Sequence, residues 1–497
     1  MALVRLIVPL VFLSILAVPV AAQPLTPEQA VARALGANPT RQAAEADVRA
    51  AGAQVRAAEG ARVPVLVVGA DGQVQESFSG TSRGVARNSS SRVGGTVALR
   101  YTTELGTQIE VAIDGGAAWR AVNLTPGTTD TVTIGPNYSA QARVDARQPL
   151  LRGAGDDATL GATRQAEAAR TAAERSRDQT MSQIALDTLS AYWELWYAQQ
   201  AMRVQEEALA LATQQLEAQR LRVEQLGTAA PADLLQLAQQ RASISESLAL
   251  AHSTRETRAI ALGRLLGMSP EGASTLVASG DPPEAASPPP VSRLASLARD
   301  ASSELMALRA QVEGARQRVR SSADADQPRL DLLGSVAVAG LWNETTIDGL
   351  QLPGDRPAFG GLVGLELELP LGTSQAAAEH EGARADLEAA EARYLAREQE
   401  LVAELAAARV EVETSARQIE LANETARLAR QLASAESERL AIGTTTPLAL
   451  VVAQQGQRES ELRTLRAIVD RVTAELGLAH RTGQLLVQSG TQTGAGS

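Results

Sequence analysis

The chain has 497 residues and a formal net charge of -11, and it contains no cysteine. The acidic balance argues against a nucleic-acid-binding protein, and the lack of cysteine excludes disulfides and thiolate metal sites. The three histidines, His252, His380 and His480, are too widely scattered for a set of metal ligands. We therefore expect no metal ion and no cofactor.

Residues 1–22 are typical of a secretory signal peptide. Arg5 supplies a positive start, residues 6–18 are apolar, and small residues precede a cleavage point at Gln23. An uncleaved membrane anchor is the alternative, but Pro9 and Pro19 interrupt a run that is already short for spanning a bilayer. A mature chain that crosses a membrane would have to do so as strands, because no later stretch is apolar for long enough.

In chain order, the first half comprises residues 23–267. We expect a helix over 26–59, a β segment over 62–153, a long helix over 158–226 and a return helix over 231–266. Apolar and polar residues alternate over 97–101 and 109–113, and the Glu-Leu-Gly turn between them predicts a hairpin. Residues 79–91 and 114–130 are rich in Gly, Ser, Thr and Asn, and we expect loops there.

The two long helices carry heptad patterns. Residues 158–226 contain no proline, and such a helix is roughly 100 Å long. In the first half the heptad positions are Leu195, Met202, Leu209, Leu216 and Val223. In the second half they are Leu401, Leu405, Ala408, Val412, Ala422, Ala426, Ala429 and Ala433. Heptads sustained over this length predict antiparallel coiled-coil packing.

The remaining segments repeat this order. A Pro-rich linker over 268–292 leads to a second repeat over 293–487, and a disordered tail is expected over 488–497. The second repeat comprises a helix, a β segment over 328–372, a long helix over 374–442 and a return helix over 447–486.

An internal repeat connects the two halves. Val48, Val55, Arg56, Pro64 and Leu66 align without a gap with Val312, Val319, Arg320, Pro328 and Leu330. The Gly-Thr turn near Gly227 is echoed near Gly443, so we expect two structural repeats of the same element order. The first β segment is longer than the second by roughly 43 residues, which would either add strands or lengthen surface loops.

Aromatic residues are scarce, and their positions are informative. Six of them lie in the β segments: Phe78, Tyr101, Trp119, Tyr138, Trp342 and Phe359. This placement is typical of a membrane barrel, where Trp and Tyr favour the interfaces. A second group, Tyr192, Trp193, Trp196 and Tyr197, lies in one helix and would either pack between helices or form a platform for a substrate.

Several motifs together resemble the TolC-type outer membrane efflux protein family over about residues 26–486. They are Arg62–Leu66 (RVPVL), Gln148–Gly153 (QPLLRG), Tyr192–Leu195 (YWEL), Leu226–Thr228 (LGT), Leu262–Gly267 (LGRLLG) and Ile442–Thr444 (IGT). Each motif is weak alone, but the two-fold repeat with both Gly-Thr turns is specific.

The resemblance implies a fold and partners. Proteins of this family are homotrimers in which an outer-membrane β-barrel of 12 strands, four from each copy, continues into a periplasmic α-barrel of long helices. The helix tips dock a periplasmic adaptor (membrane fusion) protein, which links to an inner-membrane pump of RND, ABC or MFS type. Two strands per half cannot close a barrel alone, and open edges are not tolerated in lipid, so strands in the membrane would require oligomers.

The resemblance also implies functional positions at the helix tips. The adaptor-docking residues would be Leu226, Gly227, Thr228, Ile442, Gly443 and Thr444. Relatives with a selective gate carry acids at the positions of Ala449 and Val452, and a basic residue at Thr445. Asp233 is retained, although a carboxylate is also favoured near a helix N-terminus. We therefore expect an apolar constriction at this periplasmic gate.

The sequence shows no constellation of catalytic residues, and we expect no enzyme. The function that it predicts is a passive outer-membrane exit channel of a tripartite efflux or type I secretion system, in contact with outer-membrane lipid and extending into the periplasm. A structural periplasmic coiled-coil rod or scaffold is the alternative from another class.

Overall fold

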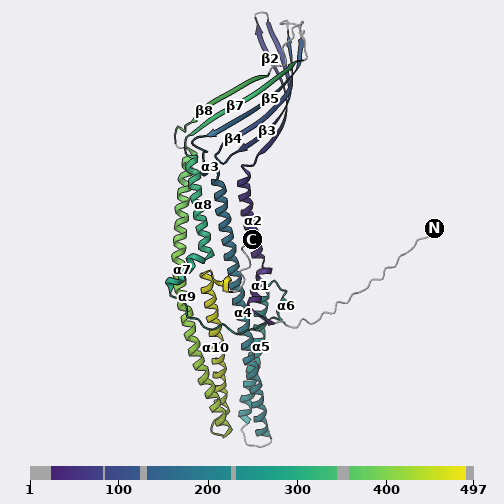
Figure 1. The fold of residues 1–497 in the computed structure, drawn as a ribbon. Helices are drawn as coiled ribbons and strands as arrows, with labels where there is room; N and C mark the ends of the chain where they lie inside the picture. Colours follow the sequence, from purple (N-terminus) through teal and green to yellow (C-terminus); the bar gives the residue numbers. More distant parts are fainter. Residues whose placement is uncertain are drawn as a thin grey trace, which may run out of the picture. The chain divides into compact units, whose positions relative to one another are not determined.

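The computed structural model describes residues 24–81, 84–123, 131–224, 231–343, 357–372 and 374–488. The described residues form two compact units, and each unit takes segments from both halves of the chain (Figure 1). The sheet unit comprises residues 44–177 and 303–398, and the helical unit comprises the other described residues. The expected repeats are therefore not separate folding units, because both contribute to each compact unit.

The helix expected over 26–59 is two helices, and the single-helix prediction is wrong. Helix α1 (Pro27–Ala37) begins at Thr26, which forms a capping box with Gln29. It ends at Asn38, and α2 (Pro39–Gly60) begins at once. A residue that precedes proline is disfavoured in the helical conformation, which explains the break.

The second half has the same break. Helices α7 (Val291–Ala301) and α8 (Ser303–Ala325) are separated by Ser302, whose backbone is extended. Ser302 is offset from Asn38 by the same interval that aligns Val48 with Val312. The two interruptions are thus equivalent positions of the repeat.

The sheet unit contains one antiparallel sheet, which has six strands within the described residues (Figure 1). The strands are β2 (Val65–Thr81), β3 (Gly84–Thr102), β4 (Gln108–Asn123), β5 (Thr131–Pro149), β7 (Arg329–Asn343) and β8 (Ala358–Glu368). They lie side by side in the order β2-β3-β4-β5-β7-β8, so only β2 and β8 are edge strands of this sheet.

The hairpin expected near Val97 and Ile113 is present, and Gly106 has a positive φ of 85° in its turn. The prediction of loops over 79–91 and 114–130 is largely wrong. Residues 84–91 and 114–123 are strand, and 82–83 and 124–130 lie outside the described residues. Ladder hydrogen bonds come from the backbone, so a segment rich in Ser, Gly and Asn can still pair. The surplus of the first β segment therefore consists of strands.

Long helices make up most of the helical unit and part of the sheet unit. They are α4 (Gly161–Glu224), α5 (Pro231–Leu265), α9 (Gln375–Ala441) and α10 (Pro447–Arg481), with short α3 (Asp156–Thr159) and α11 (Leu485–Gln488) at their ends. Heptad residues such as Leu195, Leu401, Leu405 and Val412 are buried, as coiled-coil packing requires. No helix among the described residues is long and apolar enough to cross a membrane.

The linker expected over 268–292 is partly structured. It contains α6 (Pro270–Ala273) and β6 (Val277–Ala278), and β6 pairs in parallel with β1 (Pro24–Leu25). Arg471 of α10 donates to the carbonyl oxygen of Pro283. The linker is thus held against the core of the helical unit.

The helical aromatic group anchors this arrangement. Tyr192, Trp193 and Trp196 are buried, and the ring centroids of Tyr192 and Trp193 are 5.2 Å apart in an edge-on contact. The Tyr192 hydroxyl donates to the backbone carbonyls of Leu25 and Ser279, and burial raises its pKa to about 12. Packing is therefore the role of these three residues, and the substrate-platform alternative is wrong for them.

Candidate functional site: a two-faced sheet and the helix tips

The register of the sheet separates its side chains into an apolar face and a polar face. Residues that pair across antiparallel strands point to the same side, so each transverse row belongs to one face. One row consists of Leu66, Leu99, Val111, Val144 and Val336. The next consists of Val68, Val97, Ile113, Ala142, Val338 and Phe359. These rows form a continuous apolar surface across the six described strands.

This apolar face is exposed in the single chain. Val363 is 84% exposed, Val68 is 71% exposed and Val336 is 62% exposed. A contiguous apolar surface of this kind marks contact with a membrane or with another protein.

The apolar face has two boundaries. At the end nearer the turn at Gly106, the last apolar row contains Tyr101 and Ile109. At the other end, Tyr138 pairs with Trp342. Between these rows each strand runs for about nine residues, which is the length that a tilted strand needs to cross the hydrocarbon core.

Five aromatic residues of the β segments belong to this face by register: Phe78, Tyr101, Trp119, Tyr138 and Phe359. Trp119 lies one row beyond Tyr138 and pairs with Ser91, while Phe359 lies inside the apolar rows. Phe78 is 70% exposed and lies farther out, past the ion pair of Glu76 with Arg87. Tyr101, Trp119 and Tyr138 therefore lie at the edges of the apolar rows, whereas Phe78 and Phe359 do not.

The opposite face is polar and carries connected ion pairs. Glu110 of β4 accepts from Arg100 of β3 at 2.6 Å and from Arg143 of β5 at 3.0 Å. Arg143 also lies 3.6 Å from Asp114 and 3.3 Å from Asp145. The charged residues alternate with the apolar residues of the other face, as in a wall with one wet side and one dry side.

A second group on this face centres on Asp331 of β7. Its side chain is only 2% exposed, and it accepts from Arg147 Nε at 2.6 Å and from Arg329 Nε at 2.8 Å. Arg147 also donates to Glu366 of β8 at 2.9 Å. Strands from both halves of the chain are thus joined by charge-assisted hydrogen bonds.

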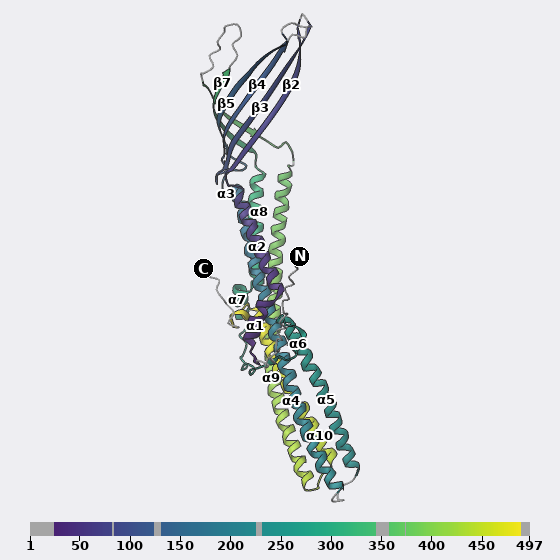
Figure 2. The same cartoon turned by 90° about the vertical axis from the view of Figure 1, so that its right-hand side faces the viewer.

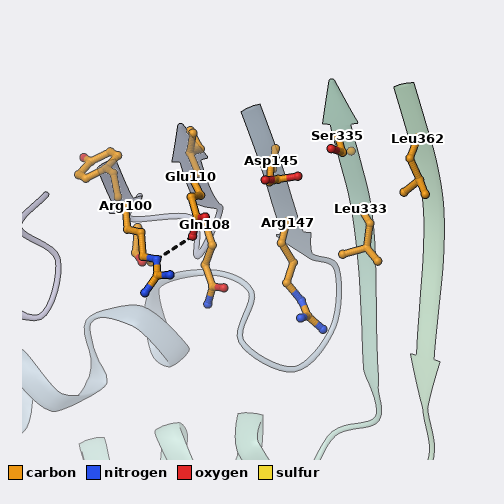
Figure 3. Close-up of a pocket in the computed structure, with 13 residues that line it drawn as sticks. Arg100, Gln108, Glu110, Asp145, Arg147, Leu333, Ser335 and Leu362 are labelled. Atoms are coloured by element: carbon orange, nitrogen blue, oxygen red, sulfur yellow. Dashed lines mark hydrogen bonds and ion pairs between the residues drawn. The ribbon is translucent and has the colours of Figure 1, made fainter. Parts of the chain in front are cut away.

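A depression of about 550 Å³ lies among these strands. Figure 3 shows Arg100, Glu110 and Arg147 on neighbouring strands, with Leu333 and Leu362 farther along the row. Its charged groups are largely paired with one another, so the depression has the character of a hydrated surface. No cluster of metal-ligating residues occurs in the described part of the chain.

The end of the sheet is attached to helix α8. Gly153 follows β5 with a φ of 88°, and its N–H donates to both oxygens of Asp324 at 3.0 and 3.2 Å. Burial raises the pKa of Asp324 above its ordinary value, although the Gly153 hydrogen bond opposes this shift. Thr159 of α3 donates to the carbonyl oxygen of Glu104 at 2.6 Å, which holds the β3–β4 turn in place.

The two helical hairpins end together at one extremity of the helical unit (Figure 2). Leu226, Gly227 and Thr228 lie outside the described residues. At the other tip, Ile442 is 76% exposed and Gly443 has a φ of 77°. Thr444 donates to the carbonyl oxygen of Arg439 at 3.1 Å, which closes the turn.

The four gate positions lie on two helices. Asp233 is in the first turn of α5. Thr445 donates to Glu436 at 2.8 Å, and Ala449 donates its backbone N–H to the Thr446 side chain. Val452 is 60% exposed on the next turn of α10. Among the described residues, no side-chain hydrogen bond or ion pair joins Asp233 to the three positions beside the second tip.

Residues 294–484 match the family model described as outer membrane efflux protein. This segment, which is less than half of the chain, is similar to outer membrane efflux proteins. The predicted resemblance to the TolC-type family is thereby confirmed, and so is the outer membrane as the location of the protein.

Solved structures extend the likeness in fold to both halves. A membrane protein from Pseudomonas aeruginosa is 19% identical with a TM-score of 0.63, and 92% of each chain is covered. The outer-membrane channel OprN is 19% identical with a TM-score of 0.62, over 92% of this chain and 90% of that one. The outer membrane protein VceC from Vibrio cholerae is 17% identical with a TM-score of 0.62, over 92% and 96%. A search of curated proteins found no match.

The charged network of the polar face was missed by the sequence analysis. The signal was present, because Glu110 and Asp114 flank the apolar residues of β4 and Arg143, Asp145 and Arg147 alternate with those of β5. Charges spaced two residues apart within an alternating strand indicate one wet face. Their partners could not be identified without the register of the sheet.

Proposed function

We propose that this protein is the exit channel of a tripartite efflux or type I secretion system, a passive duct across the outer membrane and periplasm. The observation that carries the proposal is the two-faced sheet, whose exposed apolar face has a membrane-spanning length between Tyr101 and Tyr138. The polar face would line a water-filled path. Such a duct performs no chemistry, and its energy would come from an inner-membrane pump.

Closure of the wall would require several copies of the chain. The edge strands β2 and β8 present unpaired backbone groups, which are costly in lipid. Pairing of β2 in one copy with β8 in the next would remove both edges. We propose a homotrimer, as the family resemblance implies, in which the long helices would form a periplasmic α-barrel.

The helix tips would dock a periplasmic adaptor that connects the channel to a pump of RND, ABC or MFS type. Ile442 supports this role, because an apolar side chain at an exposed turn on a rigid hairpin is a natural contact. We expect Ile442→Asp to abolish cross-linking to the adaptor while trimers persist in the membrane. Glu438→Ala, one turn earlier on α9, is the control, and unchanged cross-linking of Ile442→Asp would refute the docking role.

The gate would be closed by apolar contacts. Ala449 and Val452 are neighbours one turn apart on α10, and neither carries the acid that selective relatives have there. We expect weak block of the reconstituted channel by divalent cations. Strong block that disappears only in Asp233→Asn would contradict an apolar gate.

A periplasmic rod or scaffold is the rival function. An exposed apolar sheet face is not expected in a periplasmic rod, because it would lie in contact with water. Such a rod would also purify as a soluble protein. The two functions are separated by membrane fractionation combined with gel mobility of heated and unheated samples. We expect a membrane-bound product whose mobility changes on heating, and a soluble product without that change would favour the rod.

A further inference from the structure

The first β segment contains two strands that have no counterpart between β7 and β8 among the described residues. They are β3 and β4, which form a hairpin between β2 and β5. We propose that this inserted hairpin is part of the lipid-facing wall, so that each copy contributes six strands and three copies close an eighteen-stranded barrel. The step to three copies rests on the proposed function above.

The apolar face supports this assignment because it continues without interruption across the inserted hairpin. Val97 and Ile113 pair with each other and lie in the same row as Val68 of β2 and Val338 of β7. A hairpin folded away from the wall, for instance as a plug, would have no reason to continue the row.

The exposure of these side chains points the same way. Val97 is 47% exposed and Ile113 is 60% exposed, in the range of Val336 at 62%. Because β7 belongs to the part of the sheet that both halves share, Val336 is an internal reference for a wall residue. Exposed β-branched residues on a flat face would be unfavourable in water, and they are typical of strands in contact with lipid.

The polar face is continuous across the hairpin as well. Glu110 of the hairpin is bonded to Arg143 of β5, and Thr96 donates to Asp114 at 2.7 Å. The backbone ladders of β2 with β3 and of β4 with β5 also run along nearly the full strands. In this sheet the hairpin therefore supplies the backbone partners of β2 and β5, as strands within a bilayer require.

The consequence is a wide lumen. Barrel diameter grows roughly linearly with strand number, so eighteen strands give about 1.5 times the diameter of twelve and about 2.3 times the cross-section. Barrels of this size enclose an aqueous channel rather than a packed core. The mixed charges of Arg100, Glu110, Arg143 and Asp145 would line it without a strong preference for one sign.

Site-directed spin labelling tests the position of the hairpin, and the natural chain is suited to it because it has no cysteine. The full-length protein would carry single nitroxide labels at Val97→Cys, Gln108→Cys and Val336→Cys in lipid vesicles. The probes are oxygen, which concentrates in lipid, and a water-soluble nickel chelate. We expect the Val97 and Val336 labels to favour oxygen and the Gln108 label to favour the chelate.

The reference label separates the two ways of failing. If the Val336 label favours oxygen but the Val97 label favours the chelate, the hairpin lies outside the wall and this inference is overturned while the channel function stands. If the Val336 label also favours the chelate, the sheet is not in lipid and the proposed function fails. Electron cryomicroscopy of the wild-type assembly gives the strand number directly, and we expect eighteen strands in the wall, whereas twelve would overturn the inference.

Discussion

Asp331 is the position at which a single substitution should damage the sheet most. Its carboxylate is 2% exposed and accepts from Arg147 and Arg329, so Asp331→Ala leaves two guanidinium groups without their shared partner. Breaking a buried pair by removing one partner costs about 3–5 kcal/mol. The side chains of Arg147 and Arg329 remain 30% and 34% exposed, and water compensates part of this loss. We expect a loss of about 2–3 kcal/mol.

The assay is urea-induced unfolding in lipid vesicles, with the free energy of unfolding obtained by linear extrapolation. The matched control is Glu76→Ala, which breaks an ion pair with Arg87 whose side chains are 46% and 60% exposed. Exposed pairs contribute about 0–1 kcal/mol, so the control should change little. If Asp331→Ala costs no more than Glu76→Ala, the reasoning from burial is refuted.

Three further predictions use the same unfolding assay. Gly116→Val should lower the free energy of unfolding by about 1–3 kcal/mol, because a Cβ there would lie 2.8 Å from a backbone oxygen of β3. Gly69→Val is the control and should cost less, because a Cβ at Gly69 would have open space around it. Equal losses in the two variants would contradict this explanation. Tyr192→Phe should lower the free energy of unfolding by about 1–3 kcal/mol, because it removes the hydroxyl that donates to the Ser279 carbonyl, whereas the Leu25 carbonyl keeps the Ser279 backbone N–H as a donor. Tyr197→Phe, at a half-buried position, should cost less, and a smaller loss at Tyr192 than at Tyr197 would contradict the anchoring role. Burial raises the pKa of Asp324 above its ordinary 3.8, so the folded protein binds a proton there more readily than the unfolded chain does. The free energy of unfolding of the wild type should therefore increase relative to that of Asp324→Asn as the pH falls through the raised pKa toward 3.8. A relative decrease over this pH range would contradict the raised pKa.

The long helices and the β hairpin near Val97 could be predicted because their signals are local. Absence of proline, heptad spacing and strict alternation each act within a few turns or residues. The signal for the break between α1 and α2 is also local, because Pro39 disfavours a helical conformation at the residue before it. The break was missed because the helical periodicity continues on both sides of it. The outer parts of the hairpins were missed because these segments are rich in Ser and Gly and show no alternation of apolar and polar residues. Strand pairing there depends on backbone hydrogen bonds, which do not require such alternation.

The polar network could not have been found in this way. Arg147 and Asp331 are 184 residues apart, and their contact exists only because β5 of the first half pairs with β7 of the second. Neither residue stands out by composition, and a charge near a strand end is usually solvated. The register of the sheet, which depends on all of its strands together, turns Asp331 into a buried carboxylate shared by two arginines.

The central claim is that the sheet closes, in several copies, into the wall of an open duct. The measurement that tests it most directly is ion conductance of the purified full-length protein in planar lipid bilayers. We expect discrete conductance steps from a preparation whose particles are trimers with a change of gel mobility on heating. Trimers that insert into the bilayer yet carry no current, under conditions that should open the apolar gate, would contradict it.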